Sequence, residues 1–387
     1  MLWLLSQVVG AEPFITEMGT PVEIRSAGAW IRVFPTEESW VAAMGSNQTF
    51  YVGTLQKTGD ALTDWELTEK RQVVEISGLI DHGIKRCPDG SYLHAASGMP
   101  PEGDQGGEPT DYLHLWRYDE NFEILQYAEF RSGIGTHAHN DPNLICSPNT
   151  TGLLLSIQGY QFATDLFVLN QDLALDRVIP LEDYPRGNGG SVLYDVHDDE
   201  YIQLGMAHDK PLTINRYDAD WNLIDTVDRE VVDAPLRAYW PQGLIKVGDY
   251  YIVAHMGKDD AWQGSDKGDV FLGVFDQSWD LVEQQRVTTY EDGEAAMRPW
   301  VARKGNQLLV SFDLYNEQQI VEAKLNLSAF GLDGSEPDTG VDPQGDWNAP
   351  VSEEDANKES QCGCQSGEAA LWFPLVLLLS MRRRRQH

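Results

Sequence analysis

One short turn, repeated along the chain, constrains the fold more than any other feature of this sequence. Each copy has an aromatic or apolar residue, then Asp or Asn, two further residues and an apolar anchor. The copies are Tyr118–Phe122, Tyr217–Trp221 and Phe275–Trp279, with weaker ones at Leu169–Leu173, Leu325–Ala329 and, in shortened form, Thr63–Trp65. Their anchors follow one another at intervals of about fifty residues, which indicates a repeat architecture. The chain is therefore expected to contain six similar units.

Apolar and polar residues alternate on both sides of the turn, as in Tyr112–Arg117 and Glu123–Tyr127, and this is the pattern of paired antiparallel strands. A second hairpin precedes it in each unit, with turn residues such as Asp89-Gly90 and Gly305-Asn306. Four strands per unit are the blade of a β-propeller. A β-sandwich would not repeat one turn at nearly constant spacing. The sequence predicts an all-β protein, a six-bladed β-propeller with four-stranded blades over residues 20–331.

The last unit lacks a strand, because no apolar run follows its third strand at Ile320–Lys324. An unassigned apolar strand lies at the other end of the chain, at Pro21–Arg25. Pairing the two would close the ring and remove an exposed sheet edge. We therefore expect an N-terminal strand to complete the last blade.

The charge of the chain excludes one class of partner. Its formal net charge is −33 and its predicted pI is about 4.4. Nucleic-acid binding needs clustered cations against the phosphates, and the only cluster here is at the C-terminus. No nucleic-acid partner is expected.

Residues 332–361 have a different composition from the body, with stretches such as Asp333–Pro343 and Glu353–Asp355 that offer almost nothing to bury. Such a segment cannot offset the entropy lost on ordering. The spacing of its acidic residues does not match a regular calcium loop. We expect a flexible acidic linker.

The C-terminal residues 362–387 combine three features in order: Cys362 and Cys364, an apolar run from Ala369 to Met381, and the cluster Arg382–Arg385. The run is shorter than the roughly 20 residues of a stable span, and the arginines would remain on the cytoplasmic side. This arrangement resembles the MYXO-CTERM sorting signal of myxobacterial surface proteins. The resemblance implies processing at Cys362 or Cys364 by a sorting protease. An ordinary tail anchor is the alternative, and both place the protein at a membrane.

The first residues, 1–11, predict an abbreviated signal peptide cleaved after Ala11, although no basic residue precedes its apolar part. The alternative is an apolar N-terminal strand. Together with the tail, this segment predicts an exported protein anchored to the cell envelope or outer surface of a bacterium.

Polar segments lead into the innermost strand of several units, and in a propeller these segments line the central funnel. They contain the expected ligand-binding residues His82, His137, His139, Asp141, His197, Arg237, Trp240 and Arg298. Imidazoles next to a carboxylate also suit a divalent metal, so His137, His139 and His82 are alternative metal ligands. Histidines that only hydrogen-bond around the funnel are the simpler interpretation.

The segment His139–Asn143 resembles the Asp-Pro segment that opens a blade in five-bladed glycosidases. That resemblance implies a general base at Asp141. Glycoside hydrolysis requires a second carboxyl group, for which Glu294 is the candidate.

Aromatic rings at Tyr239, Trp240 and Trp300 could stack on sugars, and Arg237 and Arg298 could hold a carboxylate or phosphate. The same rings could instead pack between blades. No Gly-rich phosphate loop, Gly-x-Ser-x-Gly elbow or His-Glu-x-x-His motif is present. The sequence thus favours a surface-anchored propeller that binds a glycan or protein in its funnel. The alternatives are an extracellular glycoside hydrolase and a metal-dependent hydrolase.

Two cysteines in the body, Cys87 and Cys146, occupy equivalent positions in consecutive units. In an exported protein they could form a disulfide, and two buried thiols are the alternative.

Overall fold

The computed structural model divides into two compact units, Met1–Trp347 and Asn348–His387. The residues it describes all belong to the first unit. They are 12–25, 29–46, 49–75, 82–98, 112–131, 140–147, 150–156, 165–180, 190–195, 198–205, 212–231, 237–258, 268–290, 296–314 and 317–332.

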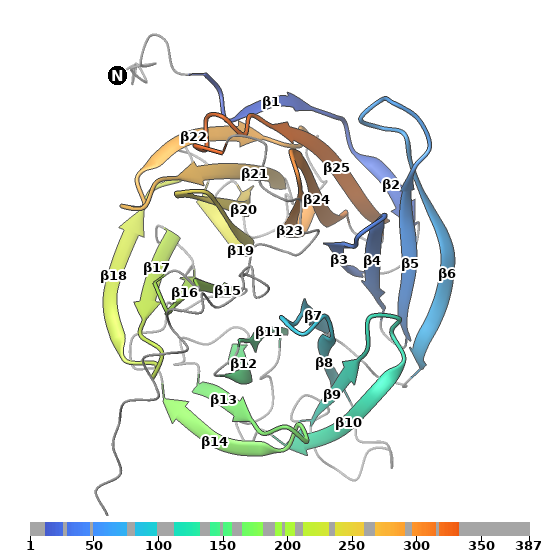
Figure 1. Ribbon diagram of the computed structural model, residues 1–387, viewed down its shortest axis with the longest axis vertical. Coiled ribbons are helices and arrows are strands. Elements are labelled where there is room, and N and C mark those ends of the chain that lie inside the picture. The colour runs from blue at the N-terminus through green and yellow to red at the C-terminus, as the bar shows by residue number, and fades with distance from the viewer. Residues whose placement is uncertain are drawn as a thin grey trace, which may run out of the picture. The chain divides into compact units, whose positions relative to one another are not determined.

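Six antiparallel sheets form a ring, which confirms the predicted six-bladed β-propeller (Figure 1). Five sheets are made of four consecutive strands each, running from the channel to the rim. Blade 1 has β3 (Ala29–Pro35), β4 (Trp40–Gly45), β5 (Thr49–Lys57) and β6 (Trp65–Glu75); blade 2 has β7 (His82–Arg86), β8 (Tyr92–Gly98), β9 (Tyr112–Tyr118) and β10 (Ile124–Arg131); blade 3 has β11 (Asn140–Cys146), β12 (Thr151–Ser156), β13 (Asp165–Leu169) and β14 (Leu175–Pro180). Blade 4 has β15 (Gly190–Asp195), β16 (Glu200–Gly205), β17 (Leu212–Tyr217) and β18 (Leu223–Arg229), and blade 5 has β19 (Arg237–Val247), β20 (Tyr250–Lys258), β21 (Gly268–Phe275) and β22 (Leu281–Arg286).

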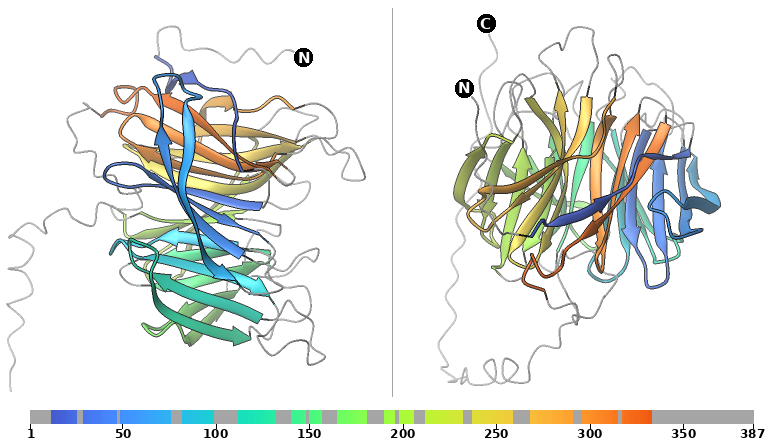
Figure 2. Two further views of the ribbon diagram at one scale, coloured as in Figure 1. Left: turned by 90° about the vertical axis from the view of Figure 1, so that its right-hand side faces the viewer. Right: turned by 90° about the horizontal axis from the view of Figure 1, so that it is seen from above.

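The sixth blade joins the two ends of the chain, as predicted. Its inner strands are β23 (Ala296–Lys304), β24 (Gln307–Leu314) and β25 (Glu317–Leu325). Both β1 (Ile15–Met18) and β2 (Val22–Arg25) pair antiparallel with β25. The predicted strand is therefore half of the closure, and β1 supplies the other half (Figure 2).

The repeated turn has a common geometry in blades 2 to 5. In blade 2 the Oδ1 atom of Asp119 accepts the backbone N–H groups of Asn121 at 2.9 Å and Glu123 at 2.8 Å. The anchor Phe122 has a φ of 58°, in the left-handed region that bulky residues rarely adopt. Asn170, Asp218 and Asp276 repeat the side-chain bonds, and the anchors Leu173, Trp221 and Trp279 repeat the φ. The acidic or amide residue of the motif thus fixes the hairpin.

Burial of the anchor compensates for this backbone strain. Trp221 stacks on Tyr201 with ring centroids 4.0 Å apart, and both side chains are buried. Phe122 on Tyr92 and Trp279 on Tyr251 repeat the stack at 4.2 and 4.3 Å. Aromatic pairs in such offset stacks contribute about 1 kcal/mol beyond their buried area.

The first and the last copy of the motif along the chain differ from the prediction. Trp65 begins β6 after a different loop, and Ala329 lies in a turn that follows β25 instead of joining two strands. Neither has the left-handed φ of the other anchors. Closure explains the second case, because the outer strand of blade 6 comes from the N-terminus.

A buried carboxylate fastens blade 6 to blade 1. Oε2 of Glu322 accepts Nε1 of Trp65 at 2.9 Å and an ion pair from Lys57, and Oε1 accepts Nε2 of Gln307 at 2.9 Å and Nζ of Lys324 at 2.8 Å. Burial raises the pKa of Glu322, but these four donors outweigh it and the pKa lies below its usual value. The carboxylate therefore remains ionised at the seam of the ring.

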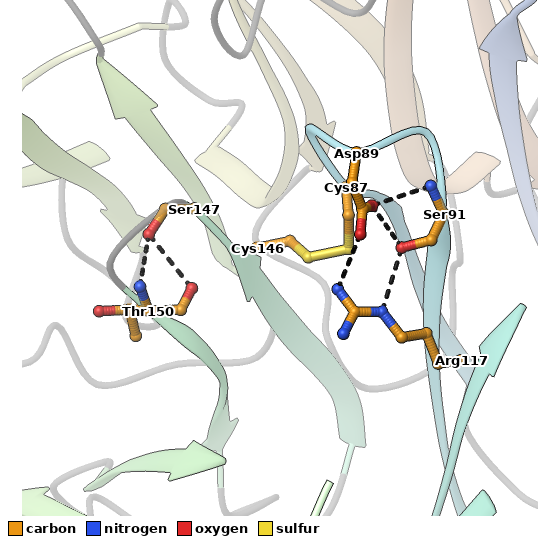
Figure 3. Close-up of a disulfide and its surroundings, with 7 residues drawn as sticks. All are labelled: Cys87, Asp89, Ser91, Arg117, Cys146, Ser147 and Thr150. Atoms are coloured by element: carbon orange, nitrogen blue, oxygen red, sulfur yellow. Dashed lines mark hydrogen bonds and ion pairs between the residues drawn. A yellow bond between two sulfur atoms is a disulfide. The ribbon is translucent and has the colours of Figure 1, made fainter. Parts of the chain in front are cut away.

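A disulfide fastens blade 2 to blade 3. Cys87 follows β7 and Cys146 ends β11, with Cα atoms 5.2 Å apart (Figure 3). Beside it, Asp89 Oδ1 accepts the backbone N–H and the hydroxyl of Ser91, and Arg117 donates to both residues. Of the two interpretations of these cysteines, the structure has the disulfide. Among the described residues, no helix is long and apolar enough to cross a membrane.

Candidate functional site

The two ends of the channel differ in the regularity of their strand pairing. Where the inner strands end, each pairs regularly with the second strand of its blade up to a tight turn, as at Lys304 opposite Gln307 and Val247 opposite Tyr250. Where they begin, the ladder is irregular in β3, β11, β19 and β23 and regular only in β7 and β15. Bulges are frequent next to functional sites, because they redirect side chains. We take the end at which the inner strands begin as the candidate site and call it the bulged end.

Three of the bulges contain a proline. In β11, Asp141 and Pro142 lie between the paired residues Asn140 and Asn143. In β19, Trp240 and Pro241 lie in the gap between Tyr239 and Gly243, and in β23, Arg298 and Pro299 lie between Met297 and Trp300. Proline has no N–H to donate to a ladder, so it is confined to strand edges and bulges. The inner strands have such an edge, facing the channel.

The bulge in β3 contains Trp30 instead, and it faces the bulge of β23 across the seam of the ring. Trp30 has a φ of 58° and Arg298 a φ of 53°, both left-handed. The guanidinium of Arg298 lies over the Trp30 ring, 4.8 Å from its centroid. Left-handed residues other than glycine persist only where the surroundings enforce them, and they concentrate at functional sites.

Asp313 holds this pair in place. Its buried carboxylate accepts the backbone N–H groups of Trp30 at 3.0 Å and Ile31 at 3.3 Å, and Nη1 of Arg298 at 3.3 Å. Burial raises the pKa of Asp313 in spite of the neighbouring Arg298 and Arg32. Two guanidinium groups thus lie close to this buried carboxylate.

Arg32 belongs to the same group of contacting residues as Trp30, Arg298 and Asp313. It is buried on β3, donates to the carbonyl oxygens of Ile31 and Arg298 at 3.0 and 3.3 Å, and lies 5.2 Å from the centroid of the Trp300 ring. Trp300 is also buried, which agrees with packing between blades and not with an open sugar platform.

His82, a predicted ligand, is buried at the start of β7 and has protein partners at both ring nitrogens. Nε2 lies 2.9 Å from the carbonyl oxygen of Ser46, and Nδ1 lies 3.0 Å from Nε2 of His94. Since a carbonyl only accepts, His82 Nε2–H donates to Ser46, its Nδ1 accepts from His94, and His94 Nδ1 accepts from the Tyr118 hydroxyl at 3.1 Å. Burial, followed by the charges of His82 and His114, holds the pKa of His94 well below its usual value. A binding or metal role for His82 stays a prediction, and it would require replacing one of these bonds.

Lys85, three residues further along β7, crosses the channel. Its Nζ donates to the carbonyl oxygen of Val192 on β15 at 2.6 Å, and the side chain is buried. The two strands belong to blades 2 and 4, with blade 3 between them. The channel is therefore crossed below the bulged end.

Other predicted site residues are described only in part. Asp141 has its backbone in β11, and Arg237 and Trp240 have theirs in β19; the three side chains lie outside the described part of the structure. His137, His139, His197, Glu294, Cys362 and Cys364 lie outside the described residues. Within the described ranges, no group of three or more His, Cys, Asp or Glu side chains is placed to hold a metal ion.

The sequence analysis missed Trp30, Arg32 and Asp313. Asp313 alone carried a signal, as an acidic residue within the apolar strand Gln307–Leu314. Its partners on β3, Trp30 and Ile31, lie more than 280 positions away, so only ring closure brings them together.

Comparison with known proteins supports the fold. No family model matches the chain, and no curated protein matches it. A Dyadobacter fermentans protein of unknown function has a similar structure, with a TM-score of 0.56 and 14% identity over 81% of this chain and 100% of that one. A Penicillium chrysogenum α-L-arabinanase solved with arabinobiose has a TM-score of 0.50 and 13% identity, covering 81% and 99%. A Fusarium graminearum α-L-arabinofuranosidase in complex with an iminosugar inhibitor has a TM-score of 0.50 and 11% identity, covering 80% and 98%.

Proposed function

We propose that this protein is a surface-anchored binding propeller that takes a glycan at the bulged end of its channel. The observation that carries the proposal is the irregular pairing at this end in four of the six inner strands, against regular pairing at the other end. Each bulge forgoes ladder hydrogen bonds and, at Trp30 and Arg298, accepts a strained backbone. A purely structural channel has no need of these departures.

The Lys85 side chain bridges β7 and β15, so the channel is crossed below the bulged end. A ligand bound above this bridge would enter and leave by the bulged end. Two neighbours of the same fold, the Penicillium and Fusarium enzymes, act on carbohydrates. Their likeness to this chain extends to the fold, so they support a glycan only as a ligand class that proteins of similar fold accommodate.

The proposal is tested by screening the full chain against immobilised glycans and measuring each hit by calorimetry. Trp240→Ala changes the residue that lies in the β19 bulge, and Leu125→Ala removes an exposed apolar side chain from the outer strand β10. We expect the first variant to lose at least about tenfold in affinity, as a stacking ring contributes on the order of 1.4 kcal/mol or more. Equal affinities of the two variants, or no binding by any glycan, would contradict the proposal.

A glycoside hydrolase is the second candidate, and the place of Asp141 favours it. Asp141 lies in the β11 bulge, at the end of the channel that the proposal assigns to the ligand. Hydrolysis needs a second carboxyl group, for which Glu294 remains the candidate. If the parent releases new reducing ends from a bound glycan, Asp141→Asn should abolish release while binding persists. A parent that binds without turnover leaves the binding function alone.

Attachment to the cell envelope is part of the proposal. The tail with Cys362, Cys364 and Arg382–Arg385 supports it, with the membrane and a sorting protease as partners. The disulfide Cys87–Cys146 also fits an exported protein, because structural disulfides persist in oxidising compartments.

A further inference from the structure

Strand β2 joins two blades at the outer edge of the ring. It pairs with β25 of blade 6, and its residues Val22 and Ile24 pack against the hydrophobic core that includes blade 1 (Figure 1). Its last residue, Arg25, pairs with Gln318 near the start of β25, and β25 begins at the bulged end. Tyr51 is close to the same end, because it is the third residue of β5 and β5 also begins there. Arg25 and Tyr51 thus belong to the rim of the bulged end and not to its channel.

The ring of Tyr51 carries two cations. The guanidinium carbon of Arg25 lies 4.4 Å from the ring centroid, and Nζ of Lys70 on β6 lies 5.3 Å from it. The two charges are therefore closer together than roughly 10 Å, the Debye length at 0.1 M salt, so salt screens their mutual repulsion only in part. The π face attracts each cation but does not neutralise it. An anion bound beside them would remove the repulsion.

No carboxylate neutralises Arg25 or Lys70 in the part of the chain that the structure describes. Neither side chain forms an ion pair or a hydrogen bond there. The chain has 61 acidic residues against 28 lysines and arginines, so a cation is expected to find a carboxylate. Many do, and examples are Lys57, Arg117, Arg216, Lys246 and Arg286. Two neighbouring cations without a carboxylate are therefore an exception in this protein.

Arg25 also has a donor without an acceptor. The residue is half-buried, and its Nη1 atom is buried with no hydrogen-bond partner among the described residues. Burial lowers the pKa of Arg25, and only the nearby Tyr51 opposes this. Buried donors of this kind are rare, since most find a partner in the protein or in water. Because part of the side chain is at the surface, an oxyanion that binds there can supply the missing acceptor.

The course of β6 presents Lys70 to this ring. The pairing of β6 with β5 shifts register twice in the middle of the strand, whereas β10, β14, β18 and β22 shift only beside their turn. One shift leaves Glu69 and Lys70 outside the paired residues, and Glu69 has a left-handed φ of 50°. The carboxylate of Glu69 accepts the hydroxyl of Thr54 at 3.3 Å instead of binding Lys70. Bulges redirect side chains, and strained residues concentrate at functional sites.

We propose that Arg25 and Lys70, around the ring of Tyr51, bind a dianionic oxyanion, phosphate or sulfate, either free or as a monoester. A guanidinium offers parallel N–H groups to two oxygens of such an anion, and an ammonium acts on it as a point charge. Two negative charges match the two cations, whereas a carboxylate would leave one of them uncompensated. The inference does not depend on the proposed glycan function, because its residues lie on outer strands and not in the channel.

The test is calorimetry of the full chain with inorganic phosphate and with sulfate, against sodium chloride of equal ionic strength. A pH of about 8 keeps phosphate dianionic. We expect the parent to bind both oxyanions and not chloride. Arg25→Gln should lose at least about tenfold in affinity, because hydrogen bonds to charged groups typically contribute that much. Lys70→Gln should lose about threefold, the contribution of an exposed charge, and Lys70→Arg should bind like the parent.

The matched control is Arg71→Gln, because Arg71 is the neighbour of Lys70 on β6 but is paired with Glu123. It removes the same charge and should leave both affinities unchanged. Melting temperatures separate loss of binding from loss of fold. If Arg25→Gln does not fold, Arg25→Lys, which keeps the charge but not the planar fork, carries the test and should retain only part of the affinity.

The source of the anion is assigned by comparing glucose 6-phosphate with inorganic phosphate, and with glucose as the control. Tighter binding of the sugar phosphate supports a monoester on a glycan, and tighter binding of inorganic phosphate supports the free ion.

Three results would overturn the inference. The parent binds the oxyanions no better than chloride, or the Arg25 and Lys70 variants bind like the parent, or Arg71→Gln weakens binding as much as Lys70→Gln. The last result would mean that only the overall charge matters. None of them affects the glycan-binding function, which is tested with neutral glycans and Trp240→Ala.

Discussion

Acidification should destabilise the propeller through His255, a buried histidine of β20. Its side chain is fully buried, stacks on Phe271 with centroids 5.7 Å apart, and has one weak bond from Nδ1–H to the carbonyl oxygen of Met256 at 3.4 Å. Nε2 has no hydrogen-bond partner. Burial lowers the pKa of His255 to about 4, against 6.5 for a free histidine, and the bond to Met256 offsets only part of this.

Whether acid raises or lowers the free energy of unfolding depends on which state, folded or unfolded, takes up the proton at His255. Below pH 6.5 the unfolded chain is protonated at His255 while the folded chain is not, so the free energy of unfolding falls as the pH falls, until both states are protonated below about pH 4. Each pH unit in this window costs about 1.4 kcal/mol. Lowering the pH from 7 to 5 therefore costs about 2 kcal/mol through this residue.

Urea unfolding followed by tryptophan fluorescence at both pH values measures this loss. His255→Gln removes the titrating group, and comparing each protein with itself at the two pH values cancels the cost of the substitution. We expect the pH-dependent loss to be about 2 kcal/mol smaller in the variant than in the parent. Part of the loss should remain, because the pKa of buried His94 is lowered in the same direction. An equal loss in variant and parent would refute the reasoning.

Four further predictions concern the fold and the tail. Glu322→Gln leaves the seam without its carboxylate and should cost about 3 kcal/mol in urea unfolding, whereas Glu123→Gln at an exposed pair should cost far less. Deleting residues 12–25 removes both strands paired with β25 and should lower the melting temperature more than deleting residues 21–25. Equal melting temperatures of the parent and the two deletion variants would contradict this closure. Replacing Cys87 and Cys146 by Ala opens a link across 59 positions and should cost up to about 4 kcal/mol, with unchanged stability counting against the link. Neutralising Arg382–Arg385, or changing Cys362 and Cys364 to Ser, should release the protein from the envelope or leave its tail unprocessed; unchanged fractionation and mass would contradict the sorting signal.

The blades could be predicted from sequence because their hairpins are fixed by nearby residues. In Tyr217–Trp221, Asp218 binds the N–H groups two and four residues further on, and Trp221 completes the turn in the left-handed region. All of this information lies within six residues. Closure was also predictable, because the missing strand of blade 6 and the unassigned strand at Pro21–Arg25 each called for a partner.

The site could be predicted only where one strand carries its own signal. The polar segments before the inner strands singled out Asp141, Trp240 and Arg298, and each of these residues precedes a proline, which is typical of a bulge. Blade 1 has no such proline, so Trp30 gave no signal, and its contact with Arg298 depends on ring closure. The hydrogen bond between His82 and His94 likewise depends on the register of β7 and β8, which a pattern of polar residues does not specify.

The described chain ends at the hairpin end of the channel, away from the bulged end. Phe14 lies near the start of the described chain, and Phe330 lies near its last residue. Their rings pack edge to face against each other and against Tyr250, which directly follows the hairpin turn of β19 and β20. The carbonyl oxygen of Phe330 lies so close to Gly248 of that turn that a Cβ atom there would meet it at 2.3 Å, so the turn requires glycine both for this contact and for its φ of 56°. The chain therefore leaves the propeller at the hairpin end, opposite the bulges. If the tail anchors the protein to a membrane, as proposed, the segment that leads to it starts from Leu332 at the hairpin end of the described propeller, opposite the end proposed to bind the glycan.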